Sequence, residues 1–333
     1  MQLCDSGKLT QTDINDRKFG IECCVPVIHP QHGDYDSSFI SKTNSATSSV
    51  RASKRRKTSA IASAPPTVQN SGETRLVQSE EDDVIQVPKD WRQFSKGGTP
   101  KGGYRAKGYF KYCLEARYKN HQVALFQCIP EGSTSMSNRM SLIQEYEVLV
   151  QASGLAKSFN ERAKLSGVSI TGLDFNAEGA FIGTTSFVPA GGLPMEETIE
   201  NDERSLLYDT FLVVPLLSTT GLYEERKFFG NNETGRNDGD WAGKLVDAFA
   251  HHVVEHCKGE YMLADLQGVI GPDRSLMLFD PQAHTKGQDS GDWDRGPKEI
   301  EKFCQEHQCN NICTQMQLWD LSKPFSVHPF RPW

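Results

Sequence analysis

Hydrophobic positions divide the chain into a long polar N-terminal part and a remainder in which short apolar runs alternate with amphipathic segments. Residues 1–83 are rich in Ser, Thr, Asn, Gln and Asp and show no sustained hydrophobic period of 2 or 3.6. A segment with so few apolar residues cannot form a core, so we predict a disordered N-terminal arm over this range. Folded sequence is expected from Val84 onward.

The first predicted elements after Val84 are the two strands of a hairpin. Residues 108–117 and 122–128 are two short runs that contain aromatic and aliphatic side chains, and a polar turn separates them at 118–121. Two such runs with a short polar connection are typical of antiparallel pairing. We therefore expect a β-hairpin here.

A long amphipathic helix follows. Apolar residues recur on one helical face over 141–163, and Ser141 with Gln144 matches a capping box at its start. Short apolar pieces with glycines over 168–189 predict strands and turns, and the acidic segment 193–204 predicts an exposed insertion.

The apolar run 210–217 predicts a strand that Pro215 interrupts. Proline lacks an N–H group and is rare in central strands, so we expect this strand at a lobe junction or a sheet edge. A second amphipathic helix is predicted over 241–255.

Two further apolar runs each end on an aspartate. Residues 261–264 precede Asp265, and residues 276–279 precede Asp280. If these strands are neighbours, both carboxylates lie at one end, where one can position a nucleophile and the other can hold Mg²⁺ on phosphates. The alternative is two ordinary turn aspartates, which is the usual interpretation of any single case.

A cysteine and histidine cluster near the C-terminus favours the metal interpretation. The nine cysteines are odd in number and unevenly spaced, which indicates reduced thiols in the cytosol or nucleus. Cys309 and Cys313 lie four residues apart, on one face of a helix, and His307 can reach the same point. Three such ligands suit zinc, and a structural zinc takes a fourth.

The fourth ligand is expected from the helix that precedes Asp265. His251 is our first choice because it can join that helix to the C-terminal one, and His252 and His256 stay open as alternatives.

Overall charge and hydropathy exclude two classes of protein. The net charge of −7 argues against a bulk nucleic-acid binder, and no apolar run reaches the roughly 18 residues that span a membrane. The basic run Lys54–Lys57 is either a nuclear localisation signal or a solvated charge run, so the expected location is cytoplasmic, nuclear or both.

Five stretches, taken together in this order and spacing, resemble the alpha-type (atypical) protein kinase family. They are Ala248–His251, Ala264–Val269, Phe279–Thr285, Gly296–Phe303 and His307–Cys313. The resemblance is strong over about 205–320, weaker over about 95–200, and absent from the arm.

The resemblance implies an α+β, two-lobed protein-kinase-like fold with a structural zinc in the C-terminal lobe. The implied kinase domain covers 84–322, with an N-lobe over about 90–210 and a C-lobe over about 211–322. Residues 323–333 are then a C-terminal tail.

The resemblance also implies roles for individual residues. Asp265 would orient or deprotonate the substrate hydroxyl, and Gln267 and Asp280 would hold Mg²⁺ on the ATP phosphates. The implied zinc ligands are His251, His307, Cys309 and Cys313. The implied nucleotide-binding positions are Val213 and Val214 in the hinge 212–215, Lys227 before a polar loop, and Gly296 in a glycine-containing loop.

Two positions depart from the family pattern. The family has a phosphate-binding lysine on an N-lobe strand, where this chain has Phe126, or Leu125 if the register slips. Lys111 or Lys119 is expected to substitute. The hinge usually carries a glutamate where this chain has Val214, which a hinge that acts through its backbone tolerates.

Three functions follow from these observations. The first is an ATP-dependent protein serine/threonine kinase, with a protein carrying a Ser or Thr acceptor as its partner and ATP, Mg²⁺ and Zn²⁺ as cofactors. The second is a pseudokinase scaffold, which the missing lysine at Phe126 favours. The third is a zinc-stabilised regulatory module in the nucleus, which rests on Lys54–Lys57.

Overall fold

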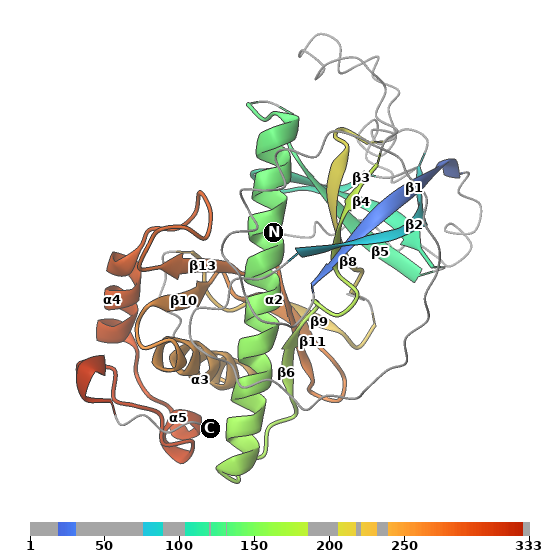
Figure 1. Cartoon of the computed structure of the whole chain (residues 1–333). Coiled ribbons are helices and arrows are strands. Elements are labelled where there is room, and N and C mark those ends of the chain that lie inside the picture. Colours follow the sequence, from blue (N-terminus) through green and yellow to red (C-terminus); the bar gives the residue numbers. More distant parts are fainter. Residues whose placement is uncertain are drawn as a thin grey trace, which may run out of the picture.

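The chain folds into two lobes that share one long helix, as the computed structural model shows (Figure 1). The structure describes residues 19–30, 76–88, 104–119, 121–130, 132–185, 206–217, 221–231 and 239–328. The basic run 54–57 and the acidic segment 193–204 lie outside these ranges. Among the described residues, no helix is both long and apolar enough to cross a membrane.

The N-lobe is a seven-stranded sheet in the order β2-β1-β7-β8-β5-β4-β3. Its strands are β1 (Phe19–Pro30), β2 (Leu76–Pro88), β3 (Tyr104–Lys107), β4 (Lys111–Tyr118), β5 (His121–Cys128), β7 (Phe181–Thr184) and β8 (Thr210–Pro215). All pairings are antiparallel, and β2 also pairs with β4, so the sheet curls round on itself. The predicted hairpin is confirmed as β4 and β5.

Two strands lie where the sequence predicted a disordered arm. Phe19–Pro30 pairs with both β2 and β7, and β2 begins at Leu76, eight residues before the expected start of folded sequence. These two segments form strands because they hydrogen-bond to strands that are distant in sequence. Local hydrophobic periodicity does not predict such partners. The arm prediction is therefore wrong for these two segments.

Strand β8 is an interior strand of the sheet, hydrogen-bonded to β5 on one side and β7 on the other. Pro215 is its last residue, so the missing N–H group does not interrupt the ladder. The expectation of a sheet-edge position was wrong, because the proline ends the strand instead of interrupting it.

Helix α2 (Ser135–Leu165) runs the length of the molecule and contacts elements of both lobes (Figure 1). It begins six residues before the predicted start. Thr134 is the N-cap and forms the capping box with Ser137, so the predicted box at Ser141 and Gln144 was wrong. Ser137 stands at N3, where the usual capping-box pattern has Glu or Gln, so the sequence pattern selected Ser141 and Gln144 instead.

The C-lobe contains two small sheets, in the orders β6-β12-β11-β9 and β10-β13. Their strands are β6 (Leu173–Phe175), β9 (Glu224–Lys227), β10 (Tyr261–Ala264), β11 (Gln267–Ile270), β12 (Leu276–Phe279) and β13 (Gln282–Thr285). The helices are α3 (Trp241–His256), which confirms the second predicted helix, α4 (Pro297–Glu306), α5 (Asn311–Gln315) and a 3₁₀ turn at Phe325–Val327.

Alternation along the central strands divides the N-lobe core into two layers. Ala124 and Phe126 of β5 face α2, whereas Val123 and Leu125 pack on the opposite face of the sheet. Successive side chains of a strand point to opposite faces, so this register decides which residues of β5 face α2.

A buried ion pair joins α2 to α3 in the C-lobe. Arg162 donates to both carboxylate oxygens of Glu255, at 2.6 and 3.1 Å, and also to the Gln317 carbonyl. Arg162 is only 2% exposed. Because a buried charge without its partner is costly, this pair fixes the packing of the two helices.

We predict that Arg162→Ala lowers the free energy of unfolding by about 3–5 kcal/mol, since it removes the bidentate arginine partner of the buried Glu255 side chain. Urea denaturation of the full chain measures this loss. Lys164→Ala, at an exposed position in the same last turn, is the matched control and should change stability by about 0.5 kcal/mol or less. A loss below about 1 kcal/mol for Arg162→Ala would contradict the account.

Candidate active site and metal centre

Strand register places two of the predicted site residues, Gln267 and Lys227, opposite each other. In the sheet β6-β12-β11-β9, Gln267 of β11 lies opposite Lys227 of β9 on one side and opposite Phe279 of β12 on the other. Asp280 follows Phe279 directly, and Asp265 precedes Gln267 by two residues. The pairing therefore gathers both aspartates, the glutamine and the lysine at one end of this sheet.

The two aspartates lie near each other as predicted, but not because the strands that precede them are neighbours. The strands that precede the two aspartates, β10 and β12, belong to different sheets and do not pair with each other. Each aspartate instead lies where the chain passes from one sheet to the other. Asp265 follows β10 and precedes β11, and Asp280 follows β12 and precedes β13.

Both aspartates adopt a left-handed backbone conformation, with φ of 52° at Asp265 and 50° at Asp280. Aspartate tolerates this region better than most residues, although it still carries strain. Paired strain at two carboxylates is typical of positions that the surrounding structure holds for function.

Asp265 is held by two contacts, one from the last residue of β9 and one from the segment that follows β9. Its Oδ1 lies 2.5 Å from Lys227 Nζ, and its backbone N–H donates to the Gly230 carbonyl at 3.3 Å. Asp265 is 8% exposed, whereas the Lys227 side chain is about half exposed. The carboxylate is therefore enclosed but reachable from solvent beside a cation.

Asp280 belongs to a charged triad that joins the two lobes. Lys111, the first residue of β4, places Nζ 3.0 Å from Asp280 Oδ1 and 2.5 Å from Glu145 Oε2 of α2. Its Nζ also lies 5.3 Å from the centre of the Phe126 ring. Lys111 thus occupies the space beside the position where the family pattern expects a lysine.

Burial and mutual attraction set the ionisation of this triad. Burial alone would lower the pKa of Lys111, but Asp280 and Glu145 raise that pKa above its usual range. Burial opposes ionisation of Asp280, yet Lys111 and, more weakly, Lys227 hold the pKa of Asp280 below its ordinary value. Burial outweighs Lys111 at Glu145 and raises the pKa of that carboxyl.

An apolar pocket opens between the lobes beside the triad. Lys111, Glu145 and Asp280 line its polar end, and Phe126, Val214 and residues 215–217 line the remainder with other apolar side chains. Val213 and Leu125 are buried on the opposite face of the sheet, so neither side chain reaches the pocket. Phe126, rather than Leu125, therefore faces the position expected of the lysine.

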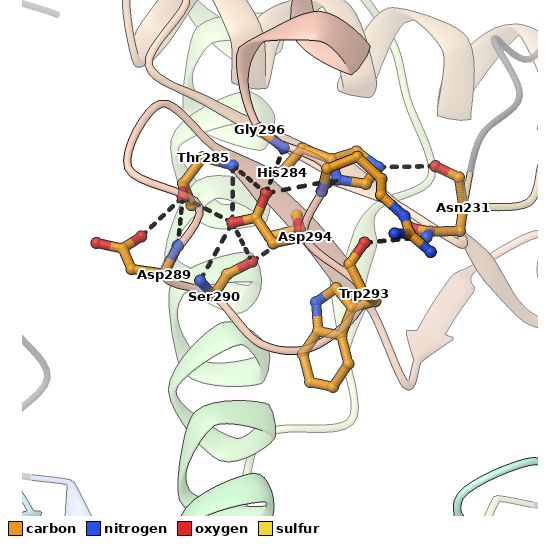
Figure 2. A network of polar contacts seen from close by, with 10 residues as sticks. Asn231, His284, Thr285, Asp289, Ser290, Trp293, Asp294 and Gly296 are labelled. Atoms are coloured by element: carbon orange, nitrogen blue, oxygen red, sulfur yellow. Dashed lines mark hydrogen bonds and ion pairs between the residues drawn. The ribbon is translucent and has the colours of Figure 1, made fainter.

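The loop between β13 and α4 is organised around the Asp294 carboxylate (Figure 2). Its oxygens accept hydrogen bonds from Thr285 and Ser290, through both the backbone N–H and the hydroxyl of each, and from the Gly296 N–H. These bonds lower the pKa of Asp294 although burial opposes ionisation. Gly296 has a φ of 74° and belongs to this loop, not to the lining of the pocket.

His284 connects this loop to the polar segment after β9 (Figure 2). Its Nδ1 accepts from the Arg295 N–H at 3.0 Å, and its Nε2 donates to the Asn231 carbonyl at 2.8 Å. Asn231 follows Gly230, whose carbonyl accepts from the Asp265 N–H. The β13–α4 loop and Asp265 are thus linked through His284 and Asn231.

Four predicted metal ligands lie together in the C-lobe. The ligand atoms of His251, His307, Cys309 and Cys313 are all within 4.8 Å of one another. Cys309 Sγ is 3.6 Å from His251 Nδ1, and Cys313 Sγ is 3.8 Å from His307 Nε2. Tetrahedral zinc with ordinary bond lengths separates nitrogen and sulfur ligands by about 3.6 Å, so the cluster fits this metal.

His251 is oriented for this role. Its Nε2 donates to the Trp319 carbonyl at 2.7 Å, which leaves Nδ1 as the unprotonated nitrogen facing Cys309. Burial, assisted by His307, lowers the pKa of His251 to about 3, so the imidazole is neutral as a metal ligand requires. His252 instead approaches Ser158 and His256, and neither alternative ligand joins the cluster.

A model of the alpha-kinase family matches residues 106–313, more than half of the chain. The chain belongs to the alpha-kinase family. This confirms the resemblance inferred from the sequence motifs, and the matched range contains the Lys111–Glu145–Asp280 triad, Asp265, Gln267 and the four metal-cluster residues.

Individual relatives agree with this assignment over shorter ranges. Eukaryotic elongation factor 2 kinase of Caenorhabditis elegans is 38% identical over 103 residues, which cover 30% of this chain and 13% of that enzyme. The chain thus spans only a small part of the curated relatives that it matches.

Two solved structures share the fold. An alpha kinase from Entamoeba histolytica aligns with a TM-score of 0.58 and 19% identity over 91% of this chain and 94% of that one. The apoenzyme alpha-kinase domain of myosin-II heavy chain kinase A aligns with a TM-score of 0.50 and 15% identity over 72% and 90% of the two chains. The predicted two-lobed α+β kinase-like fold is confirmed.

The sequence did not identify two side chains that line the pocket of this alpha-kinase. Glu145 falls within the predicted helix 141–163, but no spacing rule connects it with Lys111 or Asp280. Asn176 lies in a turn and carries no motif. Both become visible only once α2 packs against the sheet that bears Lys111 and β6 packs against α2.

We predict one tightly held zinc per chain, with a structural role. Cys313→Ala should give a protein that is insoluble or much less stable, because the binding energy of a structural metal is also folding energy. Elemental analysis of the purified full chain, with denaturation of both proteins, checks this. Cys304→Ala, at a cysteine outside the cluster, is the matched control and should keep the metal. Folded parent protein without zinc would contradict the prediction.

Proposed function

We propose that this alpha-kinase domain transfers the γ-phosphate of ATP to a serine or threonine of a protein, and that Lys111 performs the role of the phosphate-binding lysine. The observation that carries the proposal is the Lys111–Glu145–Asp280 triad at the polar end of the inter-lobe pocket. A lysine on an N-lobe strand paired with a helix glutamate, beside a metal-binding aspartate, is the arrangement that protein kinases require for activity.

Lys111 can supply the charge that Phe126 lacks. Its ammonium is protonated at neutral pH because the two carboxylates raise its pKa, and it stands next to the Phe126 ring. In phosphoryl transfer the protein acts mainly by placing positive charge where negative charge develops. A lysine reaching this point from β4 serves as well as one from β5, since the position of Nζ matters and not its strand of origin.

Asp265 is the residue we assign to the acceptor hydroxyl. It is enclosed, held from two sides and reachable from solvent, so it can accept a hydrogen bond from a serine or threonine and take up its proton. Lys227 pairs with Asp265 and holds its carboxylate in position.

Gln267 and Asp280 fit the ligand set of Mg²⁺. Both offer oxygen atoms, and the pairing of β11 with β12 places Gln267 opposite Phe279, the residue before Asp280. When bound, the cation would neutralise charge on the ATP phosphates. Lys111 already contacts Asp280. Its positive charge would reduce the repulsion between the Asp280 carboxylate and the phosphates of an entering nucleotide.

The loop between β13 and α4 suits a protein substrate. Asp294 holds it rigidly, and His284 with Asn231 links it to the segment that positions Asp265. The elongation factor 2 kinase that the chain resembles is a protein kinase by name. We therefore favour a protein over a small metabolite as the acceptor.

A pseudokinase scaffold is the second candidate. It is favoured by Phe126, which leaves β5 without a lysine facing the pocket. The two functions differ in whether Lys111 works on a nucleotide or only joins the lobes.

We predict that the full chain phosphorylates peptides containing serine or threonine with labelled ATP, and tyrosine peptides much less. Lys111→Ala should lower the rate by about two to three orders of magnitude, as expected for loss of a group that stabilises transition-state charge. Asp265→Asn defines the background. Lys119→Ala, in the β4–β5 turn and outside the pocket, should behave as the parent protein.

One further variant separates a chemical role of Lys111 from a structural one. Phe126→Lys in the Lys111→Ala background returns an ammonium to the same space, and we expect it to recover part of the lost rate. A parent protein no faster than Asp265→Asn would refute the enzyme and favour the scaffold. An active parent with an equally active Lys111→Ala variant would refute only the role of the lysine.

We also predict that Mg²⁺ with a non-hydrolysable ATP analogue stabilises the chain more than the analogue alone. A ten-fold gain in affinity corresponds to about 1.4 kcal/mol, or an increase in Tm of about 2–3 °C for a chain of this size. Asp280→Ala should abolish the difference between the two conditions, and Asp273→Ala, in an exposed loop, should retain it. Equal shifts in the parent protein would count against the assignment of Asp280.

A further inference from the structure

Two aromatic side chains are exposed at the turn between β3 and β4. Tyr109 is 88% exposed and Phe110 is 54% exposed, and their rings meet edge to face with centres 4.6 Å apart. Single exposed apolar residues are common, but two that form one patch beside a candidate active site indicate a contact surface for another molecule. Aromatic rings suit such a surface because they bury a large area and have few rotatable bonds.

The backbone that carries the two rings is held on both sides. The Gly108 N–H donates to the Lys111 carbonyl at 2.8 Å, and the Ile129 N–H donates to the Phe110 carbonyl at 2.8 Å. The Lys111 side chain is in turn bound by the two carboxylates of the triad. The aromatic pair therefore projects from a fixed base, and a binding partner does not have to order the turn.

The pair lies outside the inter-lobe pocket, next to its polar end. Lys111 follows Phe110 directly and lines that end, whereas neither Tyr109 nor Phe110 lines the pocket. The two rings are therefore placed to meet a molecule that approaches the pocket from outside, and not the nucleotide that would fill it.

A loop of the C-lobe approaches the same end of β4. Burial raises the pKa of the Cys128 thiol to about 11, and the charges of Glu145 and of Asp292 in the β13–α4 loop add to this rise. Asp292 is exposed, and Cys128 lies opposite Lys111 in the β4–β5 ladder. The aromatic turn and the β13–α4 loop thus border the polar end of the pocket from the two lobes.

The acceptor segment of a protein substrate must pass close to this turn. In the proposed function the γ-phosphate lies beside Lys111, so the acceptor hydroxyl has to reach that point. Consecutive Cα atoms are about 3.8 Å apart, which places the Cα of Tyr109 at most about 7.6 Å from that of Lys111. An extended peptide advances about 3.3 Å per residue, so positions about two or three residues from the acceptor lie at the distance of the turn.

The chemistry of the turn selects an apolar occupant. The two rings offer apolar area, and Lys107, the exposed last residue of β3, borders them with a positive charge. Aromatic rings also bind lysine and arginine, but the neighbouring positive charge opposes such a partner. An apolar side chain meets no such opposition and is stabilised by leaving water.

We propose that Tyr109 and Phe110 bind an apolar side chain of the protein substrate, about two or three residues from the phosphorylated serine or threonine, and so help to select the substrate. This rests on the proposed function, because it takes a protein as the phosphate acceptor. The contact is made to the substrate and not to the nucleotide, so its loss should change the KM for peptide and not the KM for ATP.

The test measures kcat and KM of the full chain, with ATP and Mg²⁺, on serine peptides in which one flanking position at a time carries leucine, alanine, lysine or aspartate. With the parent protein, leucine should raise kcat/KM about ten-fold over alanine at one position near the acceptor. In the Tyr109→Ala/Phe110→Ala double variant this preference should fall to about one, through a higher KM for the leucine peptide. Tyr109→Ala alone should lose part of the preference.

Two variants serve as controls. Leu165→Ala removes a comparably exposed apolar side chain, 72% exposed, at the other end of α2, and it should keep the preference. Tyr109→Phe/Phe110→Tyr retains both rings and should keep it as well. The double alanine variant should unfold at the Tm of the parent protein, because both side chains that it truncates are exposed.

Four results would overturn the inference while the kinase function stands. They are a parent protein that phosphorylates the leucine and alanine peptides equally, a double alanine variant that keeps the preference, a double variant whose KM rises for ATP instead of for the peptide, and a preference for lysine that the double variant loses. A parent protein that phosphorylates none of the peptides refutes the proposed function, and this inference with it.

Discussion

The ammonium of Lys111, held between two carboxylates, is the contact on which the architecture of the inter-lobe pocket depends. It comes from β4, Glu145 comes from α2, and Asp280 comes from the end of β12. One side chain therefore joins the N-lobe sheet, the shared helix and the end of β12 in the C-lobe. Because two buried carboxylates near each other are unfavourable without a cation, removing Lys111 would also disturb the groups that the nucleotide needs.

Helix α2 connects the Lys111 triad to the core of the C-lobe through a second ion pair. Near one end Glu145 binds Lys111, and near the other Arg162 makes a buried bidentate pair with Glu255 of α3. Helix α3 also carries His251 of the metal cluster. The pocket, the C-lobe core and the metal cluster are therefore connected through two helices, and a change in the packing of α2 would reach all three.

Local patterns predicted the elements that depend on local interactions. The β4–β5 hairpin and helix α3 followed from periodicity. His307, Cys309 and Cys313 do lie together as predicted, but Cys309 precedes α5 (Asn311–Gln315), so the expected shared helix face was wrong. The family motifs predicted the two-lobed fold. What the sequence missed depends on contacts between distant segments, such as the pairing of Phe19–Pro30 with β7 and the interior position of β8.

The same distinction applies to the candidate site. Asp265 and Asp280 stood out because each ends an apolar run, but their meeting at one sheet end follows from the register of β9, β11 and β12. Lys111 was a candidate only because Phe126 stands where a lysine is expected. Its carboxylate partner Glu145 and the pocket residue Asn176 could not be recognised, since neither residue type nor spacing marks a side chain whose role comes from packing.

The most direct test of the central claim identifies the lysine that the ATP phosphates contact. An ATP derivative with an acyl group on its terminal phosphate transfers that group to a lysine amine within reach, and mass spectrometry of the digested chain locates it. The account predicts that the labelled residue is Lys111 and that free ATP suppresses the labelling. Labelling at Lys119 or Lys227 in place of Lys111, suppressed by ATP in the same way, would contradict it.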